Sequence, residues 1–512
     1  MKVMANIERI REERMAKLTA LRRVGIEPYG DKPALDGDIA TVRARCPERP
    51  EDGQPMTESI LVAAAGRITA IRDMGKSVWL DLRDRSGQIQ VNLLQKRMPD
   101  RFQLAKFLDV GDFISASGKL QKSRTGEITI FADGIVFLAK SLEPLPEKFK
   151  GLRDKEIRFR RRYLDLAVNK DSRERFILRS RIIGHVRGYL DRRGFLEVET
   201  PMLQPIYGGA AARPFTTHHN ALDMNLYLRI SPETYLKRLL VGGLDRVYEL
   251  NRNFRNEGID TAHNPEFTMV ELYQAYADFT DMMAILEDLV SEIALALLGT
   301  TALSFAGHTI DVAKPWPRRR IHDLIRESAD CDPADDESMR ARLLRAGLAR
   351  DASQTLEHDA LLKTVMDEIV EPGLIQPTFV TNHPASLNPL CRRNREDGSL
   401  SDRFEAIVAG FELANAFTEL NDPLEQKARF EAQATREKGC EESHGDKVDE
   451  DYVSALEVGM PPAGGMGVGI DRLVMLLAGQ PSIREVVLFP TLRPKTQEEV
   501  ETTMDEALAG EE

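Results

Sequence analysis

Cysteine is scarce in this sequence. Its 512 residues include only Cys46, Cys331, Cys391 and Cys440, which are scattered and lack the paired close spacing of a zinc site or a dithiol redox motif. The sequence therefore argues against a metal or redox centre built from cysteine. A reducing compartment, the cytoplasm, fits this composition best.

Long hydrophobic runs are also missing. No apolar stretch approaches the length of a membrane span, and Met1 to Arg23 carries charges where a signal peptide would have its apolar segment. We therefore expect no membrane partner and no export. Charged residues make up 30% of the chain with both signs interspersed, which is typical of a soluble globular protein.

An excess of positive charge is the third absence. The formal net charge is -12, which argues against a protein that coats nucleic acid by bulk electrostatics. One segment nevertheless concentrates basic side chains, namely Lys148, Lys150, Arg153, Lys155, Arg158, Arg160, Arg161 and Arg162. Charge alone is equally compatible with a solvated surface, but the position of this basic segment between two apparent domains favours a binding role.

The N-terminal part of the chain has the pattern of a helix followed by short strands. Apolar residues mostly recur every three or four positions from Ile7 to Val24, which predicts an amphipathic helix. Residues 30–58 are rich in Gly, Pro and Asp without periodicity and predict a connection. From about Ile60 to Leu142, five β-rich runs punctuated by glycine predict a small barrel. The oligonucleotide-binding OB-fold is one of several barrels with this pattern.

The rest of the chain alternates helical and strand-like segments, which predicts a mixed α+β domain. Arg246 to Phe279 alternates polar and apolar residues on both sides of a polar loop, as expected for two antiparallel strands. Phe267, Met269, Glu271 and Tyr273 would share one face of the second strand. The arginine and glutamates of this segment could simply form a surface ion pair, but burying them among apolar residues would be costly without a ligand or partner.

Two further segments carry residues suited to phosphate chemistry. Glu405 and Glu412 are separated by an odd interval, so a bulge or turn near Gly410 must intervene if both carboxylates are to bind one metal ion. Paired carboxylates suit Mg²⁺, although two glutamates at this spacing are more often simply exposed. A glycine-rich stretch then precedes a predicted buried helix, residues 470–477, with Arg472 in its first turn.

Taken in order, these segments resemble the signature motifs of class II aminoacyl-tRNA synthetases. GFLEVETPML (194–203) resembles motif 1, RVYELNRNFRNEGIDTAHNPEFTMVELYQAYADF (246–279) motif 2, and PPAGGMGVGIDRLVMLLAG (461–479) motif 3. More narrowly, KFKGLRDKEIRFRRRYLDL, FRNEG, HNPEFTMVELYQAYADF and FELANAFTELNDP resemble lysyl-tRNA synthetases. The resemblance covers nearly all of residues 60–494.

The resemblance implies an α+β protein that forms a homodimer through the motif 1 region. Its catalytic domain would be an antiparallel β-sheet flanked by helices, and its barrel would be an OB-fold that reads the anticodon. The implied domains are an N-terminal helical extension and connection (1–59), the OB-fold (60–143), a basic linker (144–165), and the catalytic domain (166–512) with a helical insertion at about 315–370.

The resemblance also implies the reaction, in which ATP activates L-lysine to lysyl-adenylate and lysine tRNA then accepts the lysyl group, with Mg²⁺ as cofactor. Arg255 and Arg472 match the catalytic arginines, and such fixed guanidinium groups suit the charge that develops at phosphorus. Glu405 and Glu412 match the magnesium ligands. The positions that match ATP contacts are Arg255, Glu257, His263, Asn264, Phe267, Glu405, Glu412 and Arg472.

The implied amino-acid pocket is rich in carboxylates. Gly209 and Glu233 match positions that hold the α-ammonium group, and Glu419 matches a position that faces the ε-ammonium group. A buried carboxylate opposite a long cationic side chain is the chemistry that lysine selection requires. The positions that match lysine contacts are Gly209, Glu233, Arg255, Glu271, Tyr273, Asn415 and Glu419.

In the barrel, Arg72, Trp79 and Gln90 match positions that surround the middle anticodon base. Trp79 stands where phenylalanine is usual, and stacking should survive because any aromatic face supports a base. The alternative for Trp79 is a tryptophan of the barrel core. In the motif 2 loop, Ala262 stands where some relatives place an arginine, which removes one phosphate contact.

Three other functions stay open on the sequence alone. An aspartyl- or asparaginyl-tRNA synthetase would share the barrel and all three motifs, but Glu419 would repel an acidic side chain. An enzyme that lysylates a protein resembles the catalytic domain without the barrel. A non-catalytic paralogue acting as a binding subunit should have lost the arginines and glutamates of the reaction centre, which are present here.

We predict that Trp79→Ala impairs aminoacylation of lysine tRNA but spares lysine-dependent pyrophosphate exchange, because stacking on one base contributes roughly 1–3 kcal/mol. Both rates are to be measured on the same preparation of the variant. An equal loss in the two assays would identify Trp79 as a core residue instead.

Overall fold

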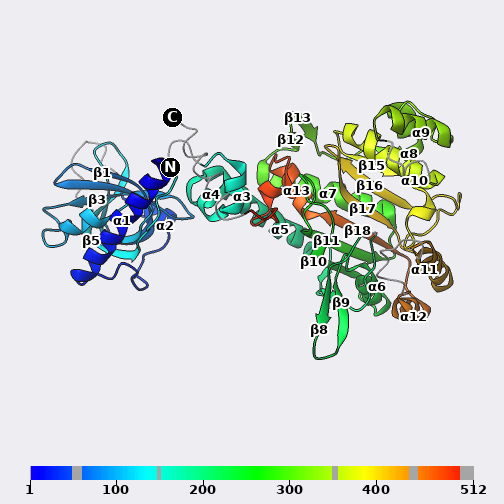
Figure 1. The fold of residues 1–512 in the computed structure, drawn as a ribbon, viewed down its shortest axis with the longest axis horizontal. Coiled ribbons are helices and arrows are strands. Elements are labelled where there is room, and N and C mark those ends of the chain that lie inside the picture. The colour runs from blue at the N-terminus through cyan, green and yellow to red at the C-terminus, as the bar shows by residue number, and fades with distance from the viewer. Residues whose placement is uncertain are drawn as a thin grey trace. The chain divides into compact units, whose positions relative to one another are not determined.

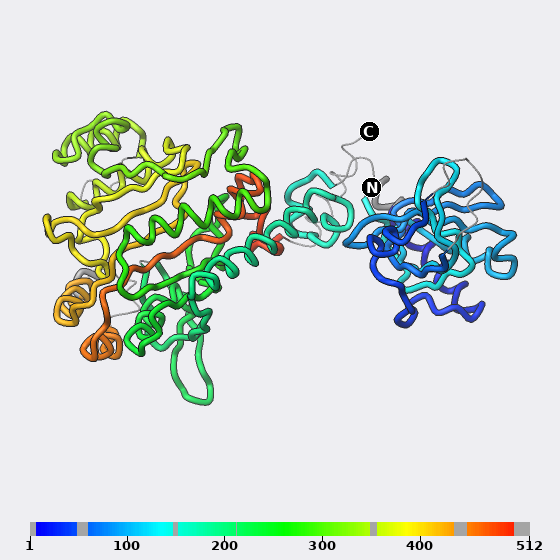
Figure 2. Tube along the Cα trace, turned by 180° about the vertical axis from the view of Figure 1, so that it is seen from behind, coloured from blue at the N-terminus to red at the C-terminus, as the bar shows by residue number. Residues whose placement is uncertain are grey.

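A computed structural model describes residues 2–48, 60–146, 152–210, 212–348, 356–437 and 448–495. It divides into two compact units, residues 1–170 with 494–512 and residues 171–493, which Figures 1 and 2 colour along the chain. Residues 49–59 of the predicted connection, Lys148 and Lys150 of the basic segment, and the end of the predicted catalytic domain from residue 496 lie outside the described residues. None of the described helices is both long and apolar enough to cross a lipid bilayer.

A closed five-stranded barrel forms the centre of the first unit, as the glycine-punctuated strand pattern predicts. All neighbouring strands are antiparallel except β3 and β5, whose parallel pairing belongs to the closed ring. Inward residues such as Leu80, Val91 and Ile130 are fully buried. In order around the barrel, the strands are β1 (Ile60–Asp73), β2 (Ser77–Arg83), β3 (Gln88–Leu94), β5 (Ile128–Ala139) and β4 (Phe113–Lys122).

The helices of this unit confirm one prediction and correct another. The predicted amphipathic helix is α1 (Lys2–Arg23), with Leu18 and Leu21 buried. The prediction of a plain connection over residues 30–58 is wrong for α2 (Ile39–Ala44), whose Ile39 and Val42 join the barrel core. Two apolar residues are too few to show a period, yet the Asp38 side chain caps this short helix by accepting from the Thr41 N–H at 2.9 Å.

Part of the basic segment is folded rather than extended. It contains α3 (Lys155–Arg160) and α4 (Arg162–Val168). Arg162 is fully buried and pairs with Asp165 at 2.6 Å, and Arg158 contacts the same carboxylate group at 3.0 Å. These two arginines therefore stabilise the local fold, and neither of the interpretations based on charge alone describes them.

An eight-stranded sheet forms the centre of the second unit. Each of its six inner strands is antiparallel to the inner strand beside it, whereas the edge strands β14 and β6 pair in parallel with their neighbours. In order, the strands are β14 (Arg318–Arg320), β15 (Thr378–Thr381), β16 (Arg403–Val408), β17 (Phe411–Thr418), β18 (Ala463–Gly469), β11 (Glu266–Ala275), β10 (Arg246–Phe254) and β6 (Leu196–Glu197).

Helices α5 (Lys170–Arg192), α7 (Phe279–Leu298) and α13 (Ile470–Leu477) share one hydrophobic core with this sheet, and α5 and α7 are seen crossing it in Figure 2. The α7 helix begins at a capping box formed by Asp278 and Asp281 and ends at Gly299 with φ 74°. Val270 and Leu272 of β11 point into this core. The intervening residues of β11 therefore project from the opposite face of the sheet.

Smaller elements surround that opposite face. Helices α6 (Glu233–Val241) and α12 (Glu450–Val458) pack together, and α11 (Pro423–Glu437) contacts α12. Strands β7 (Leu203–Gln204), β9 (Met224–Leu228) and β8 (Thr216–His219) form a second sheet, and the β8–β9 hairpin projects from the unit in Figure 1. A helical group with its own hydrophobic core contains α8 (Ile321–Ser328), α9 (Asp336–Arg345), α10 (His358–Val365) and the π-helical turn Met366–Val370.

The remaining described elements are short. Strands β12 (Ala302–Phe305) and β13 (His308–Asp311) form a hairpin after α7, and α14 (Ile483–Val486) follows α13. The 3-10 turns are Phe102–Phe107, Glu371–Gly373 and Ala385–Leu387.

Candidate active site

Glycine occupies every second position along β18 on the face of the sheet opposite α7, at Gly465, Gly467 and Gly469. A Cβ added at Gly465 would lie 2.1 Å from Glu419 Oε1 and 2.4 Å from Tyr273 Cε1. No larger residue fits there without displacing both side chains, so these glycines form the floor of a polar site. We did not predict this glycine floor from the sequence, although glycine at every second position of GMGVG indicates it.

Strand register brings polar side chains from three strands together across this glycine floor. Glu271 of β11 lies opposite Gly467, which lies opposite Asn415 of β17. Asn415 in turn lies opposite Glu405 of β16. Directly opposed residues project from the same face, so the register assembles a site that is dispersed along the sequence.

The hairpin between β16 and β17 places both predicted metal ligands on this face. Ala409 and Gly410 have positive φ angles, 56° and 77°, and the pairing register shifts by one residue within the hairpin. Ile407, two residues after Glu405, therefore lies opposite Glu412. The structure thus has a turn at Gly410, as predicted, and the register shift lies between Ala406 and Ile407.

Arg403 is a member of the site that our sequence interpretation missed. Its Nε donates to Asn415 Oδ1 at 3.0 Å, and its Nη2 donates to Glu405 Oε1. Burial opposes ionisation of Glu405, but Arg403 beside it and Lys363 at 3.8 Å hold the pKa of this carboxyl at about 2. Arg403 therefore keeps Glu405 ionised and fixes the amide of Asn415.

The surroundings of these carboxylates suit a cation. Burial and the negative charges of Glu412 and Asp367 raise the pKa of Glu371 to about 8, and such repulsion favours a bound metal ion. Oxygen donors of this kind suit Mg²⁺. Within the described ranges, no cluster of three or more His, Cys, Asp or Glu side chains forms a metal site. An ion held by Glu405 and Glu412 would therefore need further oxygen ligands, such as the phosphates of a nucleotide.

Arg255 lies just beyond β10 and over the ring of Phe267. Its Cζ is 5.1 Å from the ring centroid, and its backbone N–H donates to Pro265 O at 2.9 Å. Its buried Nε has no hydrogen-bond partner among the residues that the structure describes. A buried donor without a partner is costly, so this guanidinium group is well placed to receive an anionic ligand.

Arg472 lies in the first turn of α13, as predicted, and connects the loop after β10 with the end of the sheet. Its Nη1 donates to Glu412 O, and its Nη2 lies 3.1 Å from His263 Nε2. His263 Nδ1 lies 2.9 Å from Asp260 Oδ2. This chain of contacts brings together three of the predicted ATP-binding positions.

The structure does not bring Asn264 and Glu257 into the same cluster. Asn264 Nδ2 donates to Glu266 O at 2.6 Å, and its Oδ1 accepts from the Thr491 N–H at 3.1 Å. Glu257 is exposed, and its side chain makes no hydrogen bond with any residue in the described part of the chain. In this structure Asn264 therefore anchors the loop to the backbone near Thr491.

Buried carboxylates beside α6 form the second part of the site. Ser231 Oγ donates to Glu271 Oε1 at 2.8 Å, and Tyr273 Oη donates to Glu271 Oε2 at 3.0 Å. Burial and the charge of Glu233 raise the pKa of Glu271 to about 7. Glu419 is only 1% exposed, and its Oε1 has no hydrogen-bond donor in the described regions. Buried carboxylates are costly unless cations compensate them, so this cluster favours a ligand with positive charge.

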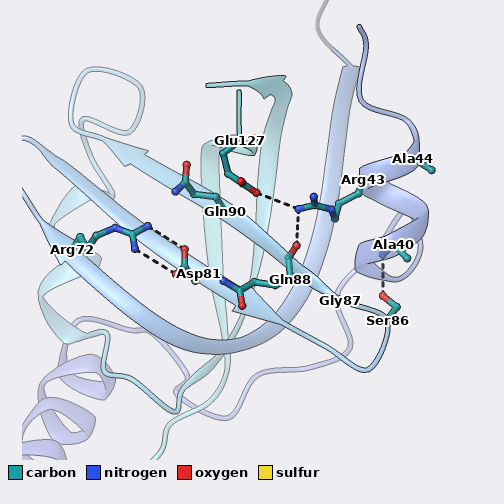
Figure 3. Close-up of a pocket in the computed structure, with 10 residues that line it drawn as sticks. All are labelled: Ala40, Arg43, Ala44, Arg72, Asp81, Ser86, Gly87, Gln88, Gln90 and Glu127. Atoms are coloured by element: carbon teal, nitrogen blue, oxygen red, sulfur yellow. Dashed lines mark hydrogen bonds and ion pairs between the residues drawn. The ribbon is translucent and has the colours of Figure 1, made fainter. Parts of the chain in front are cut away.

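One face of the barrel gathers the predicted anticodon-binding residues. Arg72 lies opposite Trp79, and Asp81, two residues further along β2, lies opposite Gln90. Arg72 and Gln90 line a cavity of about 880 Å³ in Figure 3. Trp79 is half-buried and packs edge-on against Phe131, with ring centroids 6.4 Å apart.

Two further residues shape this cavity, and our sequence interpretation missed both of them. Asp81 accepts hydrogen bonds from Arg72 Nη2 at 3.1 Å and Arg72 Nη1 at 3.4 Å, which orients the guanidinium group. Arg43 of α2 donates to Gln88 O at 2.8 Å and lies 3.4 Å from Glu127 (Figure 3). The short helix within the predicted connection therefore forms part of the cavity wall.

The antiparallel sheet with its two arginines, in one chain with a closed barrel, defines a class of protein. The family model for tRNA synthetases class II (D, K and N) matches residues 154–493, and the model for the OB-fold nucleic acid binding domain matches residues 62–138. The chain belongs to the class II tRNA synthetases.

Comparison with individual proteins narrows this class. The lysine–tRNA ligase of Syntrophomonas wolfei is 49% identical over 96% of this chain and 99% of its own length. Those of Pelotomaculum thermopropionicum and Moorella thermoacetica are 50% and 49% identical, over 95% and 94% of this chain and 95% and 98% of their own lengths. Within its class, the chain is therefore a member of the lysine–tRNA ligase family.

Gly209→Ala should raise the KM for lysine, the substrate expected from the sequence, by about tenfold or more. Gly209 has φ 86°, and an added Cβ would lie 2.8 Å from Ser231 Oγ and 3.0 Å from Glu233 Cβ. The KM for ATP should stay near the wild-type value. Gly208→Ala is the matched control, because a Cβ at Gly208 meets no atom within 4 Å. Equal KM changes in the two variants would contradict the steric argument.

Lysine binding should strengthen as the pH rises towards 7 and should level off above it. Below its pKa of about 7, Glu271 carries a proton in the ligand-free pocket. A bound ammonium group favours the ionised form, so binding releases a proton in this range. The KM for lysine at saturating ATP, measured from about pH 6 to about pH 8.5, tests this dependence. Glu271→Gln should abolish it, and a flat wild-type profile would rule out Glu271 as the titrating group.

Proposed function

We propose that this chain carries out both steps of lysine–tRNA ligation. It activates L-lysine with ATP to form lysyl-adenylate and pyrophosphate, and it then transfers the lysyl group to the 3′-terminal adenosine of lysine tRNA. The observation that carries this proposal is the buried set of carboxylates, Glu233, Glu271 and Glu419, of which Glu271 feels the charge of Arg255. An amino acid with two ammonium groups and one carboxylate is the electrostatic complement of this arrangement.

In the first step, a carboxylate oxygen of lysine attacks the α-phosphorus of ATP, and the bond to the bridging oxygen of pyrophosphate breaks. The half-buried Arg255 guanidinium group would hold both the α-phosphate and the lysine carboxylate, and Asn415 would contact the same carboxylate. Phe267 would stack on adenine, with Arg472 near the γ-phosphate. Positioning and electrostatics are sufficient for this step, so no side chain acts as a covalent nucleophile.

Glu405 and Glu412 would hold Mg²⁺, which the family generally uses. When bound, the ion neutralises the triphosphate and stabilises pyrophosphate as the leaving group. The contact between Arg403 and Glu405 keeps that carboxylate ionised and oriented before ATP arrives.

In the second step, a ribose hydroxyl of the terminal adenosine attacks the lysyl carbonyl carbon, and AMP leaves with the electrons of the acyl–phosphate bond. Arg72, Trp79 and Gln90 would hold the middle anticodon base on the barrel face. The ion pair between Arg72 and Asp81 supports this role, because it orients a guanidinium group before the base binds.

The protein would act as a homodimer that pairs through the motif 1 region. Leu196, Met202 and Leu203 of the motif 1 region are 51%, 45% and 48% exposed. Exposed apolar side chains gathered in one segment are typical of a protein–protein interface. The few scattered cysteines support a cytoplasmic location.

We expect the wild-type protein to catalyse ATP–pyrophosphate exchange that depends on lysine and on no other standard amino acid at comparable efficiency. Arg255→Ala should abolish this exchange without unfolding the protein, because its charge is needed chiefly in the transition state. Circular dichroism and the thermal midpoint would report the fold.

The control is Arg252→Ala, three residues earlier on the same hairpin. Its exposed guanidinium group lies 3.5 Å from Glu266, and an exposed ion pair of this kind contributes little. A wild-type protein without lysine-dependent exchange would support a non-catalytic binding subunit. Exchange that depends on aspartate or asparagine would show that this amino acid, and not lysine, is the substrate.

A further inference from the structure

Lys237 is a buried cation within the amino-acid pocket, and the two reaction steps above give it no role. It lies one turn after Glu233 on α6 and is 0% exposed. Its Nζ donates to Glu233 Oε1 at 2.5 Å and forms an ion pair with Glu419 Oε2. One ammonium group of the protein therefore joins two carboxylates that are proposed to bind opposite ends of the substrate.

The other neighbours of Lys237 are aromatic. Its Nζ lies 5.3 Å from the ring centroid of Phe417 on β17 and 6.0 Å from that of Tyr273 on β11. Burial alone would favour a neutral amine, but the two carboxylates raise the pKa of Lys237 above its ordinary value. Lys237 is therefore a cation held in a fixed place.

The charges of the pocket do not balance without a ligand. Glu233, Glu271 and Glu419 are each 5% exposed or less. With all three carboxyl groups ionised, the state that bound ammonium groups favour, Lys237 offsets one of their three negative charges, which leaves two. Free lysine carries two ammonium groups, and its carboxylate would face Arg255. The net charge of the pocket with lysine bound is therefore zero, and it is zero only if the charge of Lys237 is counted.

We propose that Lys237 sets the charge of the pocket and thereby selects an amino acid that carries two ammonium groups. This inference rests on the proposed function, because it takes lysine as the ligand of these carboxylates. A neutral side chain of the same length would leave one buried carboxylate without a cation. Lys237 also holds Glu233 and Glu419 at a fixed separation, so it is both a positioning and a specificity-determining residue.

A double-mutant cycle with Lys237→Met and Glu419→Gln tests this charge balance. Lys237→Met leaves three carboxylates facing two substrate ammonium groups, so the KM for lysine should rise about tenfold or more while the KM for ATP changes less than about twofold. Glu419→Gln leaves three ammonium groups facing two carboxylates and should lower kcat/KM for lysine by about a hundredfold.

The double variant distinguishes charge balance from a simple loss of contacts. With both charges removed, two carboxylates face two ammonium groups. The Lys237→Met change, harmful in the wild type, should therefore improve kcat/KM for lysine by about tenfold in the Glu419→Gln background. The proposal would be overturned if the loss of kcat/KM in the double variant equalled the product of the losses in the two single variants. It would also be overturned if the KM of Lys237→Met for lysine lay within about threefold of the wild-type value.

Arg238→Met is the matched control for structural damage to α6. Arg238 pairs with Asp449 at 2.8 Å and with Asp451 at 3.0 Å, and it makes no contact with the pocket carboxylates in the described residues. Its loss should lower the thermal midpoint and leave the KM for lysine unchanged. An equal rise in the KM for lysine in Arg238→Met would show that Lys237→Met acts through damage to α6 and not through the charge of the pocket.

The test still gives an answer if Lys237→Met does not fold, and it separates failure of the proposed function from failure of the role of Lys237. If Lys237→Met fails to fold, the comparison of Glu419→Gln with the double variant still decides, because neither of these two variants has more uncompensated carboxylates in the ligand-free pocket than the wild type, whereas Lys237→Met has one more. If the wild-type protein shows no lysine-dependent exchange, the proposed function fails. If it shows exchange but the cycle is additive, only the role of Lys237 fails.

Discussion

The free energy cost of buried negative charge is the constraint on which this site depends. Glu233, Glu271 and Glu419 lie at or below 5% exposure on one side of an antiparallel sheet, where an isolated carboxylate is strongly disfavoured. Burial accordingly raises the pKa of Glu271 to about 7. A ligand that supplies positive charge would offset this cost, and a ligand of the wrong charge would leave it uncompensated.

The scaffold solves this problem by using the two faces of each strand for different purposes. Along β11, Val270 and Leu272 point into the core shared with α7, whereas the residues between them face the site. Along β18, Met466 and Val468 are buried in the same core, and the alternate positions are glycine. The same backbone hydrogen bonds thus stabilise the fold and hold the charged groups in place, which suits chemistry that depends on preorganised charge.

Arg403 in the catalytic domain and Asp81 in the barrel each hold a neighbouring polar group in a fixed orientation. Arg403 holds Glu405 and Asn415, and Asp81 holds Arg72 in the barrel. In each case an ion pair or hydrogen bond inside the protein sets the side chain before a ligand arrives. Such preorganisation lowers the entropy lost on binding and keeps the reacting groups aligned.

The sequence by itself determined the features that arise from local periodicity. The five barrel strands, the alternation along β11, the turn at Gly410 and the position of Arg472 in the first turn of α13 all follow from spacing between near neighbours in the chain. The assignment of the site residues came from resemblance to a family, because residue types alone left Glu405 and Glu412 indistinguishable from exposed glutamates.

Only the tertiary structure decided which distant residues meet. The ion pair between Lys237 and Glu419 and the row from Glu271 to Glu405 join segments that are far apart in the sequence. Helix α2 was missed because its periodic signal is too short. The burial of Arg162 was missed although its partner Asp165 lies only three residues away, because burial depends on the assembled chain. The physical cause is that strand register and burial are properties of the assembled chain, so they determine which charges become neighbours and how strongly those charges interact.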